Sequence, residues 1–297
     1  MEKQRTFFSI IVPTYNRPIQ LEACLDSIGR LSYPKDRLEV IVVDDGGHLP
    51  LDKVIEVFRK KLNLVFISQK HSGPAIARNT GVARAKGDFL AFTDDDCRVD
   101  AEWLTILEAY VLKFKDVAIA GHVLNSIDHN IFSEASQMLL DYFYSYYNAD
   151  FQNAKFINGN DMVFPVEAFK ALGAFNVSIP YAGGEDREVC EKWMRSGRRI
   201  LYVKEAKVHH YHSLNFRTFW KQHFTYGRGA YIFRNLRSSE DKKGIRIEPL
   251  SFYYNLLCFP FFRAETKRAL SIFFLFFISQ LANALGFFAE KFKCQKK

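Results

Sequence analysis

Residues 8–47 read FSIIVPTYNRPIQLEACLDSIGRLSYPKDRLEVIVVDDGG, and this segment alternates two apolar patterns. The short runs FSIIV (8–12) and EVIVV (39–43) are rich in β-branched residues and are typical of buried strands. Residues 19–28 space their apolar side chains as one face of a helix does. The alternation continues toward residue 120, with strands predicted at 64–67 and 89–92 and helices at 51–61 and 75–85. Strands separated by helices predict an α/β fold, with a mostly parallel sheet flanked by helices.

Polar residues follow each predicted strand at its carboxyl end. In an open α/β sheet, ligands bind in the crevice outside the carboxyl ends of the strands. The sequence therefore predicts one shared site, built from residues 13–16 (PTYN), 44–47 (DDGG), 72–74 (SGP) and 94–96 (DDD).

Three consecutive carboxylates, Asp94, Asp95 and Asp96, follow the predicted strand at 89–92. Adjacent carboxylates repel one another unless a cation or solvent stabilises them. Carboxylate oxygens are ligands for Mg²⁺ and Mn²⁺, which usually keep waters and also bind substrate phosphates. We therefore expect a metal and diphosphate site here. The alternative is a solvated acidic loop before a helix predicted from residue 101.

Two further segments carry candidate functional groups. Glu185 and Asp186 follow two glycines at 183–184 and open a predicted helix. A carboxylate placed there suits a base that takes a proton from a hydroxyl, although acidic residues are also ordinary at helix N-termini. His210 and His212 share one face of a predicted strand. An imidazole beside the acidic cluster would serve as a metal ligand, and a structural histidine is the alternative.

The composition excludes several classes of protein. Of 297 residues, 48% are hydrophobic and 25% are charged, which is the balance of a globular protein with a sizeable core. The five cysteines form no CxxC pair, so neither a disulfide framework nor a cysteine-rich zinc site is expected. No Rossmann or P-loop fingerprint follows a strand. The apolar run near the N-terminus stops at Pro13 without a cleavage site, so we expect no signal peptide and a reduced, cytosolic compartment.

Charged and aromatic residues are unevenly distributed along the chain. Residues 191–297 contain 21 Lys and Arg against 7 Asp and Glu, a net charge of +14, whereas residues 1–190 carry −6. The basic part includes two Phe-rich stretches at 250–262 and 269–289, and the second has 21 residues without a charge. Such segments suit an anionic membrane surface, and a solvated basic face is the alternative. Three arrangements stay open: a single membrane span, a pair of helices in the membrane plane, and a soluble buried helix.

Six ordered motifs resemble those of a family 2 glycosyltransferase with the GT-A fold, and the resemblance extends over about residues 7–230. The motifs are SIIVPTYNR (9–17), VVDDG (42–46), GPAIARN (73–79), FTDDD (92–96), GGED (183–186) and QHFTYGRG (222–229). The resemblance implies an inverting transfer of a sugar from a nucleoside-diphosphate donor to a hydroxyl group of a glycan or lipid-linked acceptor.

The resemblance also implies roles on the donor side. Pro13 and Tyr15 would line the nucleoside pocket. Asp45 would contact the base, commonly uracil, so the expected donor is a UDP-sugar. Arg78 would lie near the nucleotide, although the residues alone leave open that it pairs with the acidic cluster.

Carboxylates would supply the chemistry that the resemblance implies. Asp94 and Asp95 would contact the donor, and Asp96 would be the direct ligand of Mn²⁺ or Mg²⁺, joined by His210. Asp186 would act as the general base. In physical terms, the ion neutralises charge that develops on the departing diphosphate, while the base deprotonates the acceptor on the opposite side of the sugar.

The same resemblance suggests how the chain is organised. Residues 1–235 would form the GT-A domain, with a nucleotide-sugar-binding half at 7–121 and an acceptor half at 122–235. Residues 236–297 would form a basic, Phe-rich, membrane-associating extension.

The expected setting is polysaccharide synthesis at the cytoplasmic face of the cell membrane. No nucleic acid partner is expected, because the C-terminal basic residues alternate with Phe-rich segments rather than with a nucleic-acid motif. Arg187 and Glu188 stand where the family more usually has a small residue followed by Asp, and this difference affects which acceptor is expected. Two alternatives are a nucleotidyltransferase-like enzyme of nucleotide sugars and a non-catalytic membrane protein that binds nucleotide sugars.

Overall fold

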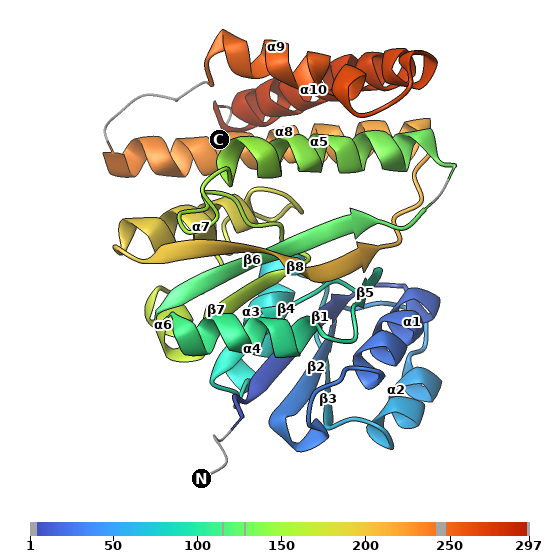
Figure 1. Ribbon diagram of the computed structural model, residues 1–297, viewed down its shortest axis with the longest axis vertical. Helices are drawn as coiled ribbons and strands as arrows, with labels where there is room; N and C mark the ends of the chain where they lie inside the picture. Colours follow the sequence, from blue (N-terminus) through green and yellow to red (C-terminus); the bar gives the residue numbers. More distant parts are fainter. Residues whose placement is uncertain (1–4, 115, 128, 242–247, 296–297) are drawn as a thin grey trace.

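A computed structural model of the protein describes residues 5–114, 116–127, 129–241 and 248–295 (Figure 1). Within this described part, eight strands form one sheet, and six of them point the same way. The two that run antiparallel to their neighbours are β7 and β5. The predicted α/β class is confirmed. The strand order is β3 (Leu64–Ser68), β2 (Leu38–Asp44), β1 (Phe8–Thr14), β4 (Phe89–Phe92), β7 (Met162–Pro165), β6 (Val117–Asn125), β8 (Arg199–His210) and β5 (Cys97–Val99).

Helices cover both faces of this sheet. Because successive strand side chains point to opposite faces, Ile10 and Val12 of β1 join a core cluster with Trp103, and Ile11 joins another with Trp193. The first face carries α1 (Pro18–Gly29), α2 (Asp52–Arg59) and α4 (Trp103–Lys113), and the second carries α3 (Pro74–Arg84), α6 (Val166–Ala171) and α7 (Glu185–Arg195). Two 3-10 turns lie at Lys35–Arg37 and Phe259–Phe262.

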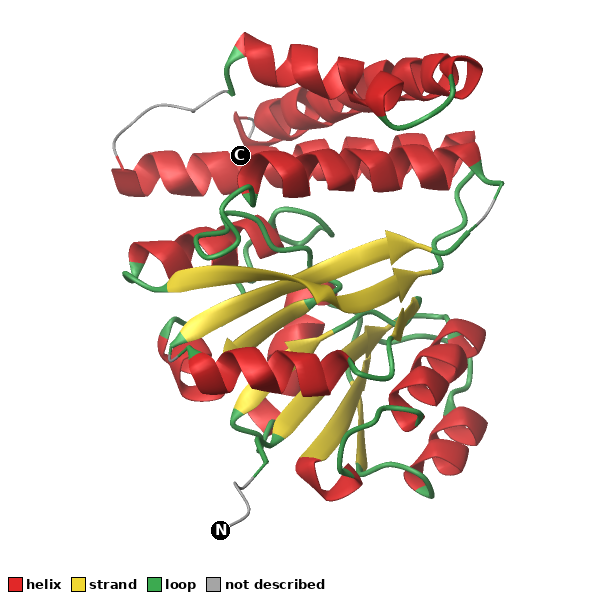
Figure 2. Ribbon diagram, in the orientation of Figure 1, coloured by secondary structure: helices red, strands yellow, loops and turns green. Residues whose placement is uncertain are grey.

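A helical layer of two rows lies beyond the second face, at the top of Figure 2. It contains α5 (Ile131–Tyr147), α8 (Phe216–Asp241), α9 (Leu250–Cys258) and α10 (Thr266–Gln295), which share a third apolar cluster. The helices α8 and α10 approach closely at glycines. A Cβ atom added at Gly227 would lie 1.9 Å from the Asn283 carbonyl oxygen, and one at Gly286 would lie 1.9 Å from that of Phe224.

The helix α10 has one face in the protein and one exposed face. Ser279 is buried, and Gln280 and Asn283 line an internal cavity. These polar residues, which weaken the apolar stretch in the sequence, therefore face the protein interior. The exposed apolar residues of α10 are Leu270, Phe274, Phe277, Leu281, Leu285, Phe288 and Phe292. Among the described residues, α10 is the one helix long and apolar enough to cross a membrane, judged by length and composition alone.

Most expected elements form at the expected places, with differences in the second half of the sheet. His210 and His212 were expected to share one face of a strand, but β8 runs continuously from Arg199 to His210 and His212 lies past its end. Lys204 and Glu205 are both exposed, next to an irregularity in the pairing of β6 with β8. These two consecutive exposed residues interrupt the alternation of buried and exposed side chains, so the sequence does not indicate one continuous strand. The helix α8 also runs through residue 235, where a domain boundary was expected.

Candidate active site

A cavity of about 640 Å³ lies where the carboxyl ends of the strands meet the helical layer. Its wall combines residues that follow β1, β2 and β4 with residues of α5, α7, α8, α9 and α10. The expectation that the strand ends form one site is therefore met. The predicted site residues that line the cavity are Pro13, Tyr15, Asp45, Arg78, Asp94, Asp95, Asp186 and His210.

Asp95 and Asp96 of the acidic cluster are buried and bound to an arginine, so the cluster is not a solvated loop. Arg17 Nη1 donates to Asp95 Oδ1 at 3.0 Å and to Asp96 Oδ2 at 2.8 Å, and Thr14 Oγ1 donates to Asp95 Oδ2 at 2.7 Å. Burial raises the pKa of Asp95 to about 6 against the opposing charge of Arg17. Burial also opposes ionisation of Asp96, but its hydrogen bond with His210 and the charge of Arg17 together hold its pKa well below the ordinary value.

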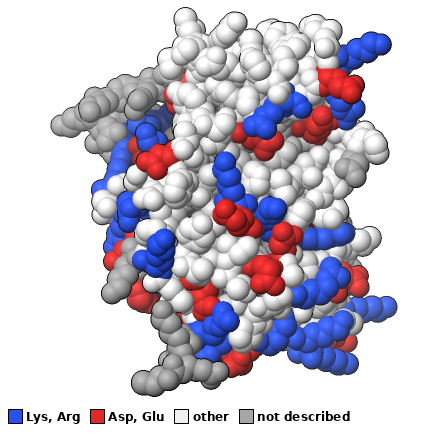
Figure 3. Space-filling view, viewed as in Figure 1, with Lys and Arg blue, Asp and Glu red and all other residues white. Residues whose placement is uncertain are grey.

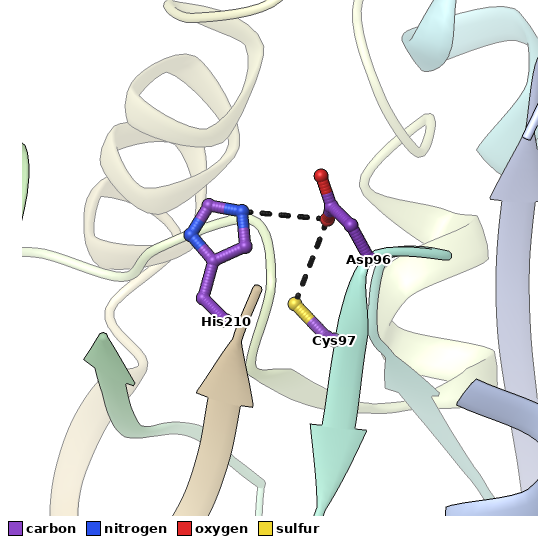
Figure 4. A group of neighbouring side chains, drawn as sticks. All are labelled: Asp96, Cys97 and His210. Atoms are coloured by element: carbon purple, nitrogen blue, oxygen red, sulfur yellow. Dashed lines mark hydrogen bonds and ion pairs between the residues drawn. The ribbon is translucent and has the colours of Figure 1, made fainter. Parts of the chain in front are cut away.

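Asp96 and His210 lie together at the place expected for a cation (Figure 4). His210 Nε2 is 3.3 Å from Asp96 Oδ1, and ligand atoms of Asp96, Cys97 and His210 all lie within 4.8 Å of one another. Carboxylate oxygens suit Mn²⁺ and Mg²⁺, and a neutral imidazole is a common ligand of transition-metal ions such as Mn²⁺. Burial raises the pKa of the Cys97 thiol well above its ordinary value, and sulfur is a softer ligand than Mn²⁺ or Mg²⁺ prefer. The donor set of Asp96 and His210 thus fits the expected ion.

Arg78 connects the acidic cluster to the acidic turn. It is buried, and its Nη2 donates to Asp94 Oδ1 at 2.8 Å while its Nη1 donates to Glu185 Oε1 at 3.0 Å. Both terminal nitrogens are therefore engaged by carboxylates, which is the pairing that the sequence left open. Burial, together with the charge of Asp186, raises the pKa of Glu185 to about 7 against the charge of Arg78.

Asp186 is held by backbone amides on one side only. Its Oδ1 accepts hydrogen bonds from Gly184 N at 3.2 Å and Arg187 N at 2.8 Å, and no described residue donates to its Oδ2. Gly183 and Gly184 have φ angles of 94° and 111°, which favour glycine. A Cβ at Gly183 would also lie 2.5 Å from the Tyr226 ring. The two glycines therefore allow the turn to press against α8 and to present one free carboxylate oxygen.

The other end of the cavity is built around Asp45. Its Oδ1 accepts hydrogen bonds from Gln69 Nε2 at 2.7 Å and Ser72 N at 2.9 Å, and its Oδ2 accepts one from Gly73 N at 2.8 Å. His71 Nδ1 lies 2.9 Å from the same Oδ2. The His71 ring also stacks on Tyr15, with ring centroids 4.4 Å apart. Three donors and the His71 ring therefore surround the carboxylate, and the His71 ring covers the face of Tyr15.

Sequence reasoning missed three residues of this site. Arg17 lies three positions past the end of β1, at the same edge of the sheet as the acidic cluster. This position of a basic residue could have indicated that it pairs with the cluster. His71 precedes the predicted 72–74 segment by one residue. Glu185 was noted only as the partner of Asp186 in the acidic turn, and no local pattern indicates its ion pair with Arg78, 107 positions away.

Comparison with known proteins gives one family and several relatives. A family model described as "Glycosyl transferase family 2" matches residues 9–173. Glycosyltransferase AglE of Haloferax volcanii is 36% identical over 100 residues, which cover 33% of this chain and 33% of that protein. Succinoglycan biosynthesis protein ExoM of Rhizobium meliloti is 28% identical over 215 residues, which cover 70% of this chain and 68% of that protein.

The first relatives are matched over a minor part of their own length. The match to the poly(ribitol-phosphate) beta-N-acetylglucosaminyltransferase TarS of Staphylococcus aureus is 35% identical and covers 35% of this chain and 18% of that protein. The matched part thus spans a third or less of AglE and TarS.

Solved structures share the fold. The mannosyltransferase PcManGT from Pyrobaculum calidifontis, in complex with GDP-Man and Mn²⁺, has a TM-score of 0.67 at 17% identity, covering 95% of this chain and 88% of that one. S. aureus TarS 1-349 in complex with UDP-GlcNAc has a TM-score of 0.54 at 16% identity, covering 98% of this chain and 92% of that one. At these identities the likeness concerns the fold alone, and it is the GT-A type that the sequence predicts.

Proposed function

This chain belongs to glycosyl transferase family 2, and we propose that it transfers a sugar from a nucleoside-diphosphate donor to an acceptor hydroxyl by a single inverting displacement. One observation carries the proposal. The same cavity is lined by the acidic cluster with Asp94 and Asp95 and by Asp186, whose Oδ2 has no donor among the described residues. A diphosphate site and a base in one cavity are the two parts that such a displacement needs.

In this proposal, the nucleoside lies at Pro13, Tyr15 and Asp45, and a UDP-sugar is the donor. Tyr15 offers an aromatic face on which a base can stack. A carboxylate has about four acceptor positions, and those of Asp45 are occupied by Gln69, His71 and the amides of residues 72 and 73. The His71 side chain is 59% exposed, so it is the partner that can leave when the base arrives.

The proposed cation is Mn²⁺ or Mg²⁺, held by Asp96 and His210, with Asp94 and Asp95 beside the donor. Bound there, the ion would neutralise charge on the departing diphosphate. PcManGT is a fold neighbour that was solved with GDP-Man and Mn²⁺, which supports this assignment for a related fold. Within the chain itself, Arg17 already supplies one positive charge to Asp95 and Asp96.

Asp186 is the proposed general base. The amides of Gly184 and Arg187 fix one carboxylate oxygen and thereby orient the other. The free oxygen would take the proton of the acceptor hydroxyl as that hydroxyl attacks the sugar. Attack opposite the departing diphosphate inverts the configuration at the anomeric carbon, and no covalent intermediate with the protein is required.

We also propose that the protein works at the cytoplasmic face of a membrane, with α10 lying in the membrane plane. The helix α10 packs along α8, and α8 carries Arg217 and Lys221 on exposed positions. A spanning α10 would draw these charges toward the bilayer, at about 2.5–3.5 kcal/mol for each charge at its centre. The upper end of the molecule, over α9 and α10, shows mostly uncharged residues (Figure 3). Residues 248–295 would thus form a membrane-facing cap on the acceptor half at 122–235, while 7–121 bind the donor.

The experiment that tests this function is release of nucleoside diphosphate from UDP-, GDP- and dTDP-sugars, with Mn²⁺, Mg²⁺ or EDTA. We expect metal-dependent release from one donor, its loss in Asp96→Asn, and wild-type release in Asp26→Ala, whose carboxylate is 48% exposed on α1. Release of pyrophosphate would instead indicate a nucleotidyltransferase. Binding of a donor without any release, by folded protein supplied with membrane lipid extract, would indicate a non-catalytic protein that binds nucleotide sugars. Neither binding nor release with any donor would contradict the proposed function.

A further inference from the structure

A continuous row of aromatic rings leads from the neighbour of Asp186 to the outer helix α9. The Arg187 guanidinium lies 4.7 Å from the ring centre of Tyr147 and 5.4 Å from that of Phe156. Phe143 and Phe252 continue the row, with centroids 5.8 Å between Phe156 and Phe143 and 6.4 Å between Phe143 and Phe252. All of these side chains line the same cavity as the acidic cluster.

Several apolar side chains of the cavity wall are only half-buried. The cavity lies between three helices, and the apolar side chains around it remain accessible. They are Leu140 and Phe143 of α5, Phe233 of α8 and Tyr253 of α9. Apolar surface of this kind favours an apolar occupant by about 25 cal/mol for each Å² removed from water. Pockets with apolar walls and a few polar groups are typical of small-molecule sites. The helical layer therefore offers a place for a hydrocarbon group next to the proposed base.

Arg187 supplies a positive charge at the inner end of this row. Neighbouring arginines are neutralised, Arg78 by Asp94 and Glu185 and Arg228 by Glu290. Among the described residues Arg187 has no such ion pair and instead packs on two aromatic faces. Glu248 also lines the cavity, but its charge is stabilised by the Tyr147 hydroxyl at 2.9 Å. Arg187 interacts with the Tyr147 hydroxyl and with the charge of Asp186, but a guanidinium has five N–H donors. It therefore keeps donors for a phosphate, which it binds through two parallel hydrogen bonds.

The outer end of the row lies near an exposed apolar surface. On α9 and the turn after it, Leu250, Tyr254 and Phe262 are 88%, 69% and 81% exposed. An apolar chain that reaches the cavity past α9 would come from the same surface that we propose to face the membrane. Its hydrocarbon part would then have little contact with water on the way.

We propose that the acceptor is an amphiphile whose phosphate group binds Arg187, whose hydrocarbon chain lies in the aromatic part of the cavity between α5, α8 and α9, and whose headgroup carries the hydroxyl that reaches Asp186. Lipid phosphates and lipid diphosphates with a hydroxyl-bearing headgroup share this chemistry. The inference rests on the proposed function only in calling the bound amphiphile an acceptor. The binding site itself requires neither a donor nor turnover.

Calorimetry on the full chain without donor tests this inference, with decyl phosphate below its micelle concentration, decanol and inorganic phosphate as probes. We expect decyl phosphate to bind at least about tenfold more tightly than either other probe, since it alone contacts both parts of the site. Arg187→Gln should abolish the preference for decyl phosphate over decanol. Leu140→Trp and Ala230→Leu, which fill the cavity from two helices, should each weaken binding of both decyl compounds about tenfold.

A control separates the cavity from the outer surface. Phe277→Ser changes the exposed face of α10 and should leave decyl phosphate binding unchanged. Wild-type affinity in both folded filling variants, or a loss confined to Phe277→Ser, would overturn the inference. An unchanged preference in Arg187→Gln would overturn the role of Arg187. If the protein binds decyl phosphate but turns over no nucleotide sugar, the proposed function is wrong and this binding site stands. If it turns over a nucleotide sugar but does not bind decyl phosphate, the function stands and this binding site is wrong.

Discussion

Two arginines allow four carboxylates to lie close together at one end of the cavity. Arg17 bridges Asp95 and Asp96, and Arg78 bridges Asp94 and Glu185. Buried carboxylates that remain unpaired would take up protons or unfold the site. The arginines thus offset part of the cost of burying these carboxylates and hold them together, and they leave Asp186 as the carboxylate with a free oxygen.

Glu185 makes the stability of the protein depend on pH. Burial and the charge of Asp186 raise its pKa from 4.5 to about 7, so the folded chain binds this proton more tightly than the unfolded chain does. The free energy of unfolding should therefore fall as pH rises from about 4.5 to 7, by about 1–3 kcal/mol from this group. Urea unfolding at pH 5 and 7.5 checks this, because Glu185→Gln should remove that part of the decrease. Replacing the exposed Glu205 by Gln should leave the decrease unchanged. An equal decrease in the free energy of unfolding in all three proteins would contradict the prediction.

His71 occupies the place proposed for the nucleotide base. It lies against Asp45 Oδ2 and stacks on Tyr15, and both contacts must break before a base can make them. His71→Ala should therefore raise the affinity for UDP severalfold, as expected for removing about 1 kcal/mol of competing contacts. Calorimetric titration measures this, with the exposed His48→Ala as the control. Weaker binding in His71→Ala would mean that the imidazole contacts the nucleotide itself.

At the scale of elements, the contact of α8 with the acidic turn positions the proposed base. A Cβ added at Gly229 would lie 1.8 Å from the Gly183 carbonyl oxygen. Gly229→Ala should therefore push residues 183–184 away from α8, lower the free energy of unfolding by about 1–3 kcal/mol and reduce sugar transfer. Thermal unfolding and transfer assays check this against Gly29→Ala, whose Cβ would meet no atom within 4 Å. A Gly229→Ala protein as stable and active as Gly29→Ala would show that the contact is unimportant.

The elements of the first half are predictable because each carries its own pattern. The runs at 8–12 and 39–43 are buried on both faces, and β1 and β2 form there. The short strand β5 was missed because Cys97–Val99 offers only three residues, and it is a strand through its pairing with β8. The placement of α10 was left open because Ser279, Gln280 and Asn283 appear in the sequence as polar interruptions, whereas the fold turns them toward α8 and the cavity.

The candidate site was predictable where the residues follow strand ends. Asp94, Asp95 and Asp186 lie at one cavity, and Asp96 contacts His210 as expected for a shared cation. Contacts between distant segments were not predictable. The bond from Arg78 to Glu185 depends on how α3 meets α7, and the row from Arg187 to Phe252 depends on how α9 packs on α5. No local spacing records either arrangement.

At the scale of the whole molecule, the exposed face of α10 should bind an anionic membrane surface. We expect the protein to sediment with phosphatidylglycerol vesicles, to bind neutral vesicles less, and to be released by alkaline carbonate, because a helix in the membrane plane is held less firmly than a span. Phe277→Ser with Phe288→Ser should weaken vesicle binding about tenfold or more, since both side chains are about half exposed. Resistance to carbonate would instead indicate a spanning helix.

The central claim is that Asp186 removes the proton of the acceptor. The direct measurement compares sugar transfer to a membrane lipid extract by wild-type protein and by Asp186→Asn, after UDP binding to both has been measured. An amide cannot act as this base, so we predict transfer reduced by about 10²–10⁴-fold with UDP affinity unchanged. Transfer near the wild-type rate by folded Asp186→Asn would contradict the account, because the cavity would then catalyse the reaction without its proposed base.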